Sequence, residues 1–195
     1  MVRMMEIIGL LLVIFSLGCV NNNGDYRYVR NASGQILAEQ YTMQIDVNFT
    51  PQEKTGIKRG IDQWNYALNG LIEIKVISET FNMEIDILRS QGAHDWVIMK
   101  TDESNPMIDK PDTLGFVDYI GGNKIWIVME RMDVTWVAGV TMHEIGHLLG
   151  LKHSENLMAP RYQWNQARCV DYEAVQQLSQ VKKIDLGDLN YCYYY

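Results

Sequence analysis

The sequence predicts an α+β fold, in which a twisted, mixed five-stranded sheet is backed by helices and followed by a small C-terminal helical subdomain. Two observations lead to this expectation. Strand-like and helix-like patterns follow one another in the order strand, helix, four strands and two helices, without an internal repeat. Apolar residues make up 47% of the 195 positions, so a single domain of this length can bury a core. We expect that domain to span residues 41–195.

Residues 1–18 have the order of a signal peptide. Arg3 precedes an apolar run over residues 7–17, and small Gly18 stands before Cys19. A helix needs about 20 residues to span a bilayer, and this run is shorter. The ending resembles a lipoprotein signal, so we expect cleavage before Cys19, a lipid on that cysteine, and export to the cell envelope or the extracellular space. The alternative is an ordinary signal or an uncleaved anchor, with Cys19 incidental.

The segment after the signal is interpreted as a flexible tether. Residues 19–40 are polar and contain Asn and Gly, a composition that favours a linker over a packed element. Export also bears on the remaining cysteines, because disulfides persist outside the reducing cytosol. Cys169 and Cys192 are an even pair once Cys19 carries a lipid, and we expect them to form a disulfide; two free thiols are the alternative.

The charge of the chain bears on its partners. The formal net charge is −7, whereas a nucleic-acid-binding domain calls for a basic face. We therefore expect no nucleic-acid partner. We also expect a monomer, attached to a membrane only through its lipidated N-terminus.

The first strand and helix of the domain follow each other directly. Residues 41–49 alternate and are rich in β-formers, which predicts a strand. Thr50, Pro51 and Glu53 then form a helix start, with a capping Thr, Pro at the first helical position and Glu at the third. The helix is expected to end at Asn69 with the Gly that follows. Its apolar stripe comprises Ile57, Ile61, Trp64 and Leu68.

Four further strands are predicted before the next helix. Residues 71–77 and 83–89 have strand patterns, and residues 90–112 are interpreted as a polar loop. Residues 113–120 and 124–129 predict two strands joined through a Gly-Gly-Asn turn, which favours a hairpin.

Two helices complete the predicted domain. One begins at Asp133 as its capping residue and runs to about Leu149. The other covers residues 171–184. The side chains expected to face the core are Trp136, Val137, Val140, Ile145, Leu148 and Leu149 on the first helix, and Val175, Leu178 and Val181 on the second.

Three of the four histidines lie in one short segment of the first of these two helices and the chain after it. His143 and His147 are four residues apart, so a helix stacks them on one face where they can bind one metal ion together. Glu144 lies beside that pair, where it can contact a water on the metal without being a ligand. Gly150 can end the helix and turn the chain, which returns His153 as a third ligand. Three imidazoles leave one position open, as in a catalytic zinc site.

The stretch HEIGHLLGLKH matches H-E-x-x-H-x-x-G-x-x-H, the signature of the metzincin metalloproteases. With Ser154 after the third histidine and Met158 in the nearby NLMAP, it most resembles the matrixin-like branch. The resemblance implies a metzincin-like (zincin) fold with an active-site helix, one zinc ion, and Met158 in a turn beneath the metal. Ala159 and Pro160 depart from the pattern, since related proteins carry a Tyr at one of these positions. A structural calcium ion is left open; a second, His-rich zinc site is excluded because only His94 remains.

The resemblance implies a zinc-dependent endopeptidase that hydrolyses peptide bonds with a metal-bound water and with Glu144 as general base. The substrate would be a protein or peptide, lying extended along a sheet edge. The alternative is a catalytically silent, metal-containing surface binding protein; the intact Glu144 speaks against it. The edge residues that the resemblance implies are Leu114, Gly115, Phe116 and Val117.

Overall fold

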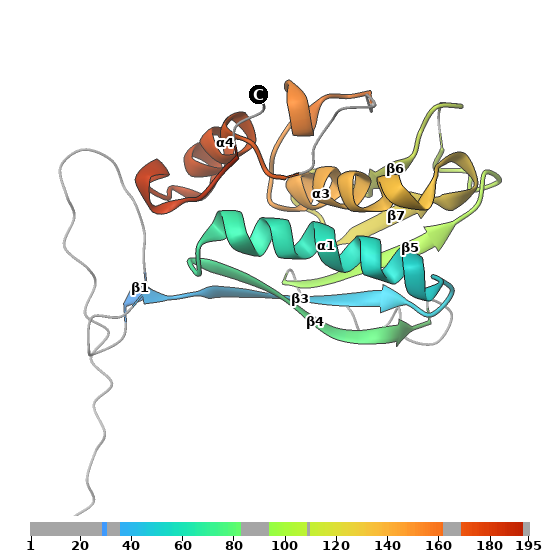
Figure 1. Cartoon of the computed structure of the whole chain (residues 1–195), viewed down its shortest axis with the longest axis horizontal. Coiled ribbons are helices and arrows are strands. Elements are labelled where there is room, and N and C mark those ends of the chain that lie inside the picture. The colour runs from blue at the N-terminus through green and yellow to red at the C-terminus, as the bar shows by residue number, and fades with distance from the viewer. Residues whose placement is uncertain (1–28, 31–35, 83–93, 109, 162–168, 193–195) are drawn as a thin grey trace, which may run out of the picture.

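The computed structural model describes residues 29–30, 36–82, 94–108, 110–161 and 169–192, and in this part helices lie along one face of a main sheet (Figure 1). This arrangement confirms the predicted α+β class. None of the described helices combines the length and the apolar character needed to cross a membrane. The strands are β1 (Val29–Arg30), β2 (Ile36–Leu37), β3 (Glu39–Asp46), β4 (Ile72–Phe81), β5 (Asp95–Thr101), β6 (Gly115–Val117) and β7 (Lys124–Val128). The α-helices are α1 (Pro51–Leu68), α3 (Val137–Leu148) and α4 (Tyr172–Lys182), and the 3-10 helices are η1 (Met129–Arg131), η2 (Val134–Trp136), η3 (Asn156–Met158) and η4 (Leu186–Asp188).

The main sheet contains five strands in the order β4-β3-β5-β7-β6. Neighbours from β4 to β7 pair in parallel, and β6 pairs with β7 in the antiparallel sense, so the sheet is mixed as predicted. β1 and β2 form a separate antiparallel pair. Because β6 stands at the end of the order, one of its edges has no partner strand among the described residues.

The central strand of the sheet was missed. The strand predicted at 83–89 lies outside the described residues. The prediction of a loop over 90–112 is wrong for residues 95–101, which form β5. β5 pairs with β3 on one side and β7 on the other, and its residues Trp96 to Met99 are all buried. A parallel strand covered on both faces has consecutive apolar residues instead of an alternation. A short run of this kind carries no period that identifies it as a strand.

The predicted hairpin is confirmed, with a shorter first strand. β6 covers only Gly115–Val117 of the predicted 113–120, and β7 covers nearly all of the predicted second strand. The Phe116 ring stacks on the Trp126 ring with centroids 5.1 Å apart, which fixes the register of the pair. The connection turns through Gly121, whose φ of +80° favours glycine.

The start and end of α1 confirm the helix signals in the sequence. The Thr50 side chain accepts a hydrogen bond from the Glu53 backbone N–H, and the Glu53 carboxylate accepts one from the Thr50 N–H, which is a capping box. Pro51 occupies the first helical position, where no N–H is needed. Asn69 ends the helix in the left-handed conformation, with φ of 49°.

Two glycines allow α1 and α3 to pack closely side by side (Figure 1). A Cβ atom added at Gly56 would lie 2.9 Å from the Val137 Cβ, and one added at Gly60 would lie 2.9 Å from the Ala138 carbonyl oxygen. Real Cβ atoms do not approach so closely, so any other residue would push the helices apart. The position of α3, which carries two of the histidines, therefore depends on these glycines of α1.

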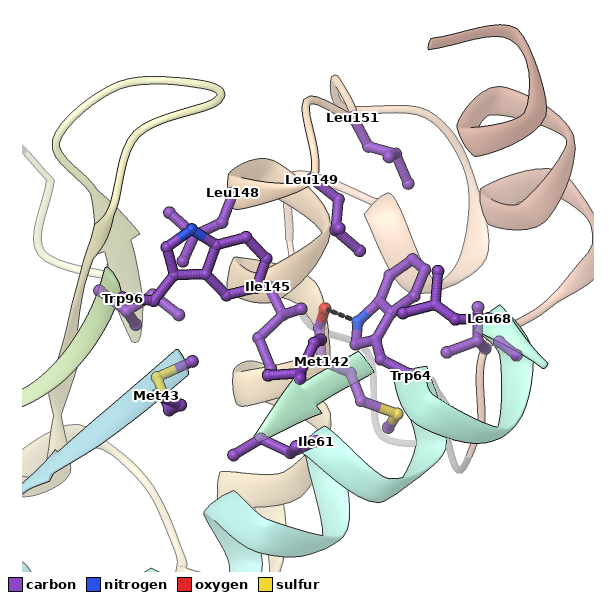
Figure 2. Close-up of a cluster of buried hydrophobic side chains, with 14 of the residues drawn as sticks. Met43, Ile61, Trp64, Leu68, Trp96, Met142, Ile145, Leu148, Leu149 and Leu151 are labelled. Carbon is purple, nitrogen blue, oxygen red and sulfur yellow. Dashed lines mark hydrogen bonds between the residues drawn. The ribbon is translucent and has the colours of Figure 1, made fainter. Parts of the chain in front are cut away.

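Buried side chains join the two helices to the sheet. The Trp64 indole N–H on α1 donates to the Met142 carbonyl oxygen of α3 at 2.8 Å, while Met43 and Trp96 reach the same cluster from the sheet (Figure 2). Every residue of the stripe predicted on α1 is buried. On α3 the predicted core residues are buried as well, except that Trp136, in the 3-10 turn before the helix, is half-buried.

The last helix, α4, begins where the sequence predicts. Asp171 caps it by accepting a hydrogen bond from the Ala174 N–H, and Val175 and Leu178 are buried as expected. Val181 was wrongly assigned to the core, because its side chain is 46% exposed. It lies over Gly150, which has no side chain to cover it.

A disulfide holds the C-terminal segment to the start of α4. Cys169 and Cys192 are bonded, with Cα atoms 6.3 Å apart. The Cys192 N–H also donates to the Val170 carbonyl oxygen at 3.0 Å, and Cys192 forms a β-bridge with Asp171. The disulfide and the backbone pairing of Cys192 together hold the residues around Asp171 in place.

Candidate metal centre and active site

One face of α3 presents two histidines. His143 and His147 are one helical turn apart, and their Nε2 atoms lie 3.1 Å from each other. The two rings meet edge to face, with centroids 4.7 Å apart. Because α3 is packed against α1 and the sheet, both rings are presented by a helix that cannot readily shift.

Gly150 turns the chain so that a third histidine reaches the same place. Its φ is +99°, and its N–H donates to the His147 carbonyl oxygen at 3.0 Å. The Leu151 N–H donates to the Gly146 carbonyl oxygen at 2.9 Å, which completes a Schellman motif. After this turn the Nε2 atom of His153 lies 3.2 Å from that of His147.

Two backbone carbonyl groups orient the histidines on the helix. The Nδ1 atom of His143 lies 2.7 Å from the Leu157 carbonyl oxygen, and that of His147 lies 2.8 Å from the Leu151 carbonyl oxygen. A carbonyl oxygen can only accept, so each Nδ1 carries the proton and donates it. This leaves the Nε2 lone pairs directed at their common centre, as in metal-binding histidines.

The surroundings keep the three imidazoles neutral. Burial, together with the neighbouring His147, lowers the pKa of His143 to about 3. Burial also lowers the pKa of His147. The pKa of His153 is lowered by partial burial and by the positive charge of Lys110. Neutral imidazole is the form that binds a metal ion.

The trio fits a zinc ion. Among the described residues, these three are the one group of His, Cys, Asp or Glu side chains whose ligand atoms are close enough to share an ion, within 4.8 Å of one another. A zinc–nitrogen distance of about 2.0–2.1 Å in a tetrahedron separates two ligand nitrogens by about 3.3 Å. The Nε2 atom of His147 lies 3.1 Å from that of His143 and 3.2 Å from that of His153, close to this value. Calcium needs six or more oxygen ligands, and no cluster of carboxylates among the described residues supports the calcium ion that the sequence left open.

Met158 lies directly beneath the part of α3 that carries the histidines. It ends η3, is fully buried, and its Sδ would be 2.5 Å from a Cβ atom added at Gly146. Gly146 stands between His143 and His147 in sequence, so the lack of a side chain there makes room for the methionine. The Ser154 N–H donates to the Met158 carbonyl oxygen at 3.0 Å and closes the turn.

Asp171 links the C-terminal helix to this turn, a role that the sequence did not reveal. Its buried carboxylate accepts one hydrogen bond from the Ala174 N–H and another from the Leu157 N–H, each at 2.9 Å. The Leu157 carbonyl oxygen in turn holds His143. From the sequence, Asp171 could be recognised only as the start of a helix. Its contact with Leu157, 14 residues away, forms only when the chain folds.

Glu144 lies beside the histidines with one unpaired oxygen. Its side chain is buried, and Oε1 would lie 2.9 Å from a Cβ atom added at Gly115 of β6. The other oxygen, Oε2, has no hydrogen-bond partner among the described residues. Burial raises the pKa of this carboxyl group to about 8. Glu144 therefore occupies a site suited to exchanging a proton near neutral pH.

The comparison with protein families agrees with this geometry. The matrixin family model matches residues 39–180, from the first residue of β3 into α4. The chain belongs to the matrixin family. The crystal structure of metalloproteinase-II from Bacteroides fragilis is similar, with a TM-score of 0.51 and 17% sequence identity. The match covers 74% of this chain and 52% of that one, so the chain spans about half the length of that protein, and the likeness concerns the fold. No curated protein matches the sequence significantly.

In this matrixin chain a cleft of about 670 Å³ runs past the metal centre. All three histidines and Glu144 contribute to its wall. Ala159 and Pro160, where the sequence departs from the matrixin pattern, also line it, so neither position supplies a phenol there. The predicted edge residues that line the cleft are Leu114, Gly115, Phe116 and Val117.

Proposed function

We propose that this matrixin is a zinc-dependent endopeptidase that hydrolyses peptide bonds in proteins or peptides. The observation that carries the proposal is the convergence of three Nε2 atoms beside a buried carboxylate with an unpaired oxygen. A metal-binding site with a structural role alone needs neither an open position nor such a carboxylate.

His143, His147 and His153 would hold the zinc ion through Nε2. When bound, zinc polarises the carbonyl group of the scissile peptide bond and makes a water molecule more acidic. The hydrogen bonds from Nδ1 to the Leu157 and Leu151 carbonyl groups keep the first two rings in the binding tautomer. These bonds belong to the protein and hold the site ready before any metal arrives.

Glu144 would act as the general base and then as the general acid. Its Oε2 is buried at the cleft without a partner among the described residues, so it can accept a proton from water. The same carboxyl group can pass that proton to the amine that leaves. Burial raises the pKa of this carboxyl group, which favours its uptake of that proton.

The free edge of β6 would bind the substrate. β6 pairs only with β7 among the described strands, so the backbone groups on its other side can pair with an extended peptide. Gly115 lies against Glu144 and both line the cleft, which brings a peptide on this edge close to the proposed base.

The proposal is tested with the zinc-loaded protein and a broad peptide library, followed by mass-spectrometric mapping of the products. We expect cleavage that stops with a zinc chelator, returns with added zinc, and is lost in Glu144→Ala, which keeps all three ligands. Cleavage that persists in Glu144→Ala would contradict the role of this residue. Stoichiometric zinc binding with no cleavage of any peptide would support the silent binding protein instead.

We also propose that the chain is exported and attached to a membrane by a lipid on Cys19. The tether expected over residues 19–40 would then include the short β1–β2 pair and end before Glu39, where β3 of the catalytic domain begins, two residues earlier than the expected boundary at 41. The order of residues 1–19 supports this, while residues 1–28 lie outside the described structure. Metabolic labelling with a fatty acid in a bacterial host, with Cys19→Ser as the control, tests it. Label that persists in Cys19→Ser would contradict a lipid on this cysteine.

A further inference from the structure

The cleft has different chemistry at the two ends of β6. Gly115 lies against Glu144, so a peptide along β6 has its scissile bond near this glycine. Towards the N-terminal side of β6 the peptide meets Lys110, Asp112 and Thr113, and towards the C-terminal side it meets Tyr119 and Ile120. Tyr119 is four residues from Gly115, at most about 13 Å in extended chain. Each end of the cleft therefore contacts substrate residues within about four positions of the bond that is cut.

The end before β6 is positively charged. Lys110 lines the cleft, and its ammonium group has no carboxylate partner among the described residues. Arg161 lines it as well; its ion pair with Asp112 is long, at 3.9 Å, and both side chains are largely exposed, so this pair holds the guanidinium weakly. Arg131 donates to the carbonyl oxygens of Lys110 and Thr113, which holds this segment in place. Asp112 also lines this end of the cleft, so two cationic side chains and one carboxylate give it a net positive charge.

The end after β6 is apolar and exposed. Tyr119 is 64% exposed and Ile120 is 47% exposed, and both line the cleft. Their loop is held by two backbone bonds, from the Gly121 N–H to the His147 carbonyl oxygen at 2.8 Å and from the Gly122 N–H to the Tyr119 carbonyl oxygen at 2.9 Å. Large apolar side chains that a fixed loop presents to water at a cleft are typical of a binding surface.

We propose that the cleft selects peptides that carry an acidic side chain on one side of the scissile bond and a large apolar side chain on the other. Lys110 and Arg161 bind the acidic side chain, and Tyr119 and Ile120 bind the apolar one. Antiparallel pairing with β6, the more stable kind, places the acidic residue C-terminal to the bond that is cut. This inference deepens the proposed peptidase function and rests on it for the position of the scissile bond.

The first experiment compares two fluorogenic peptides of identical composition, using the zinc-loaded full-length protein in detergent. One has Leu before and Glu after the central bond, within four residues, and the other has the two exchanged. We expect kcat/KM to be about five- to tenfold higher for the first peptide, and the ratio to shrink at high salt because the charged pair is exposed. Equal cleavage of the two peptides, while other peptides are cut, would overturn the inference and leave the peptidase function intact.

Two variants with matched controls assign the preference to its residues. Lys110→Glu is expected to lower kcat/KM for the Glu peptide about tenfold and to raise it for a Lys analogue. Lys75→Glu makes the same charge change at an exposed position of β4 and should leave kcat/KM unchanged for both the Glu peptide and its Lys analogue.

Tyr119→Ser should lower kcat/KM for the Leu peptide about fivefold relative to an Ala analogue. Tyr66→Ser, on α1 and 62% exposed, is its control. Equal effects of a variant and its control would overturn the assignment.

A binding measurement separates this inference from the peptidase function. Fluorescence anisotropy of the labelled Glu peptide with Glu144→Ala reports binding without cleavage. Tighter binding of the Glu peptide than of its Lys analogue, lost in the double variant with Lys110→Glu, supports the cleft preference even if the wild-type protein cuts nothing. Equal binding of both peptides, together with cleavage by the wild-type protein, rejects the preference alone.

Discussion

The carboxylate of Asp171 accepts a hydrogen bond from the backbone N–H of Leu157 at 2.9 Å. The same peptide segment holds the metal centre, because the Leu157 carbonyl oxygen accepts the Nδ1 proton of His143. Asp171, which caps α4, is therefore connected through Leu157 to His143, and these hydrogen bonds help to orient the histidine. A buried carboxylate that accepts from two backbone N–H groups is difficult to replace, since each group would lose its partner.

Asp171→Ala is expected to weaken zinc binding about 10- to 100-fold, the usual effect of losing an indirect partner of a ligand. Leu157 would lose the bond that fixes it, and His143 would lose its orientation. Competition with a chromophoric chelator measures the affinity. Asp185→Ala is the matched control, because Asp185 also accepts a backbone N–H at the start of a helix, the 3-10 helix η4. A loss of zinc affinity that is equal in the two variants would contradict the link.

Gly146→Ala is expected to destabilise the protein by about 1–3 kcal/mol through overpacking. The new Cβ would approach the Met158 Sδ to 2.5 Å, and this outweighs the better helix propensity of Ala, worth about 1 kcal/mol. Urea denaturation measures the change in the free energy of unfolding. If the clash is the cause, the double variant with Met158→Ala is less destabilised than the sum of the two single variants. Additive effects would show that Met158 is not the group displaced.

Gly150→Ala is expected to lower both stability and zinc affinity. A side chain at a positive φ costs about 1–2 kcal/mol, and the Schellman turn that delivers His153 would be strained. Gly70→Ala is the control, since Gly70 also has a positive φ, of 76°, but follows α1 away from the metal centre. Both variants should lose stability in urea, and only Gly150→Ala should lose zinc affinity. Unchanged zinc affinity in Gly150→Ala would contradict the proposed role of the turn.

Replacing both Cys169 and Cys192 by Ser is expected to lower the free energy of unfolding by about 3 kcal/mol, as the bond closes a loop with a sequence separation of 23. The comparison is made by urea denaturation at equilibrium. Treating the wild-type protein with a reductant should give the same loss, while the reductant should leave the double variant unchanged. A double variant as stable as the oxidised wild type would show that the bond does not restrain the unfolded chain.

Local patterns accounted for the helices and for the metal-ligand candidates. The capping box at Thr50 and the stripe that follows it are contained within one turn or one face of a helix, so neighbouring residues are enough to recognise them. The same holds for His143, Glu144 and His147, which one helix aligns. Gly150 shows its role through its own backbone conformation. Neighbouring residues were not enough to recognise the central strand β5. Its consecutive buried residues are explained only by the layers that cover both of its faces.

The sequence by itself determined the chemistry of this protein: three histidines, a glutamate and a methionine turn lie within residues 143–158, where a helix and one glycine turn suffice to converge them. Only the tertiary structure brought in their partners. Asp171 reaches Leu157, Gly115 reaches Glu144, and the two ends of β6 form a cleft with a basic and an apolar wall. These contacts join segments that are far apart along the chain, and their geometry depends on how helices and strands pack, which no local pattern records.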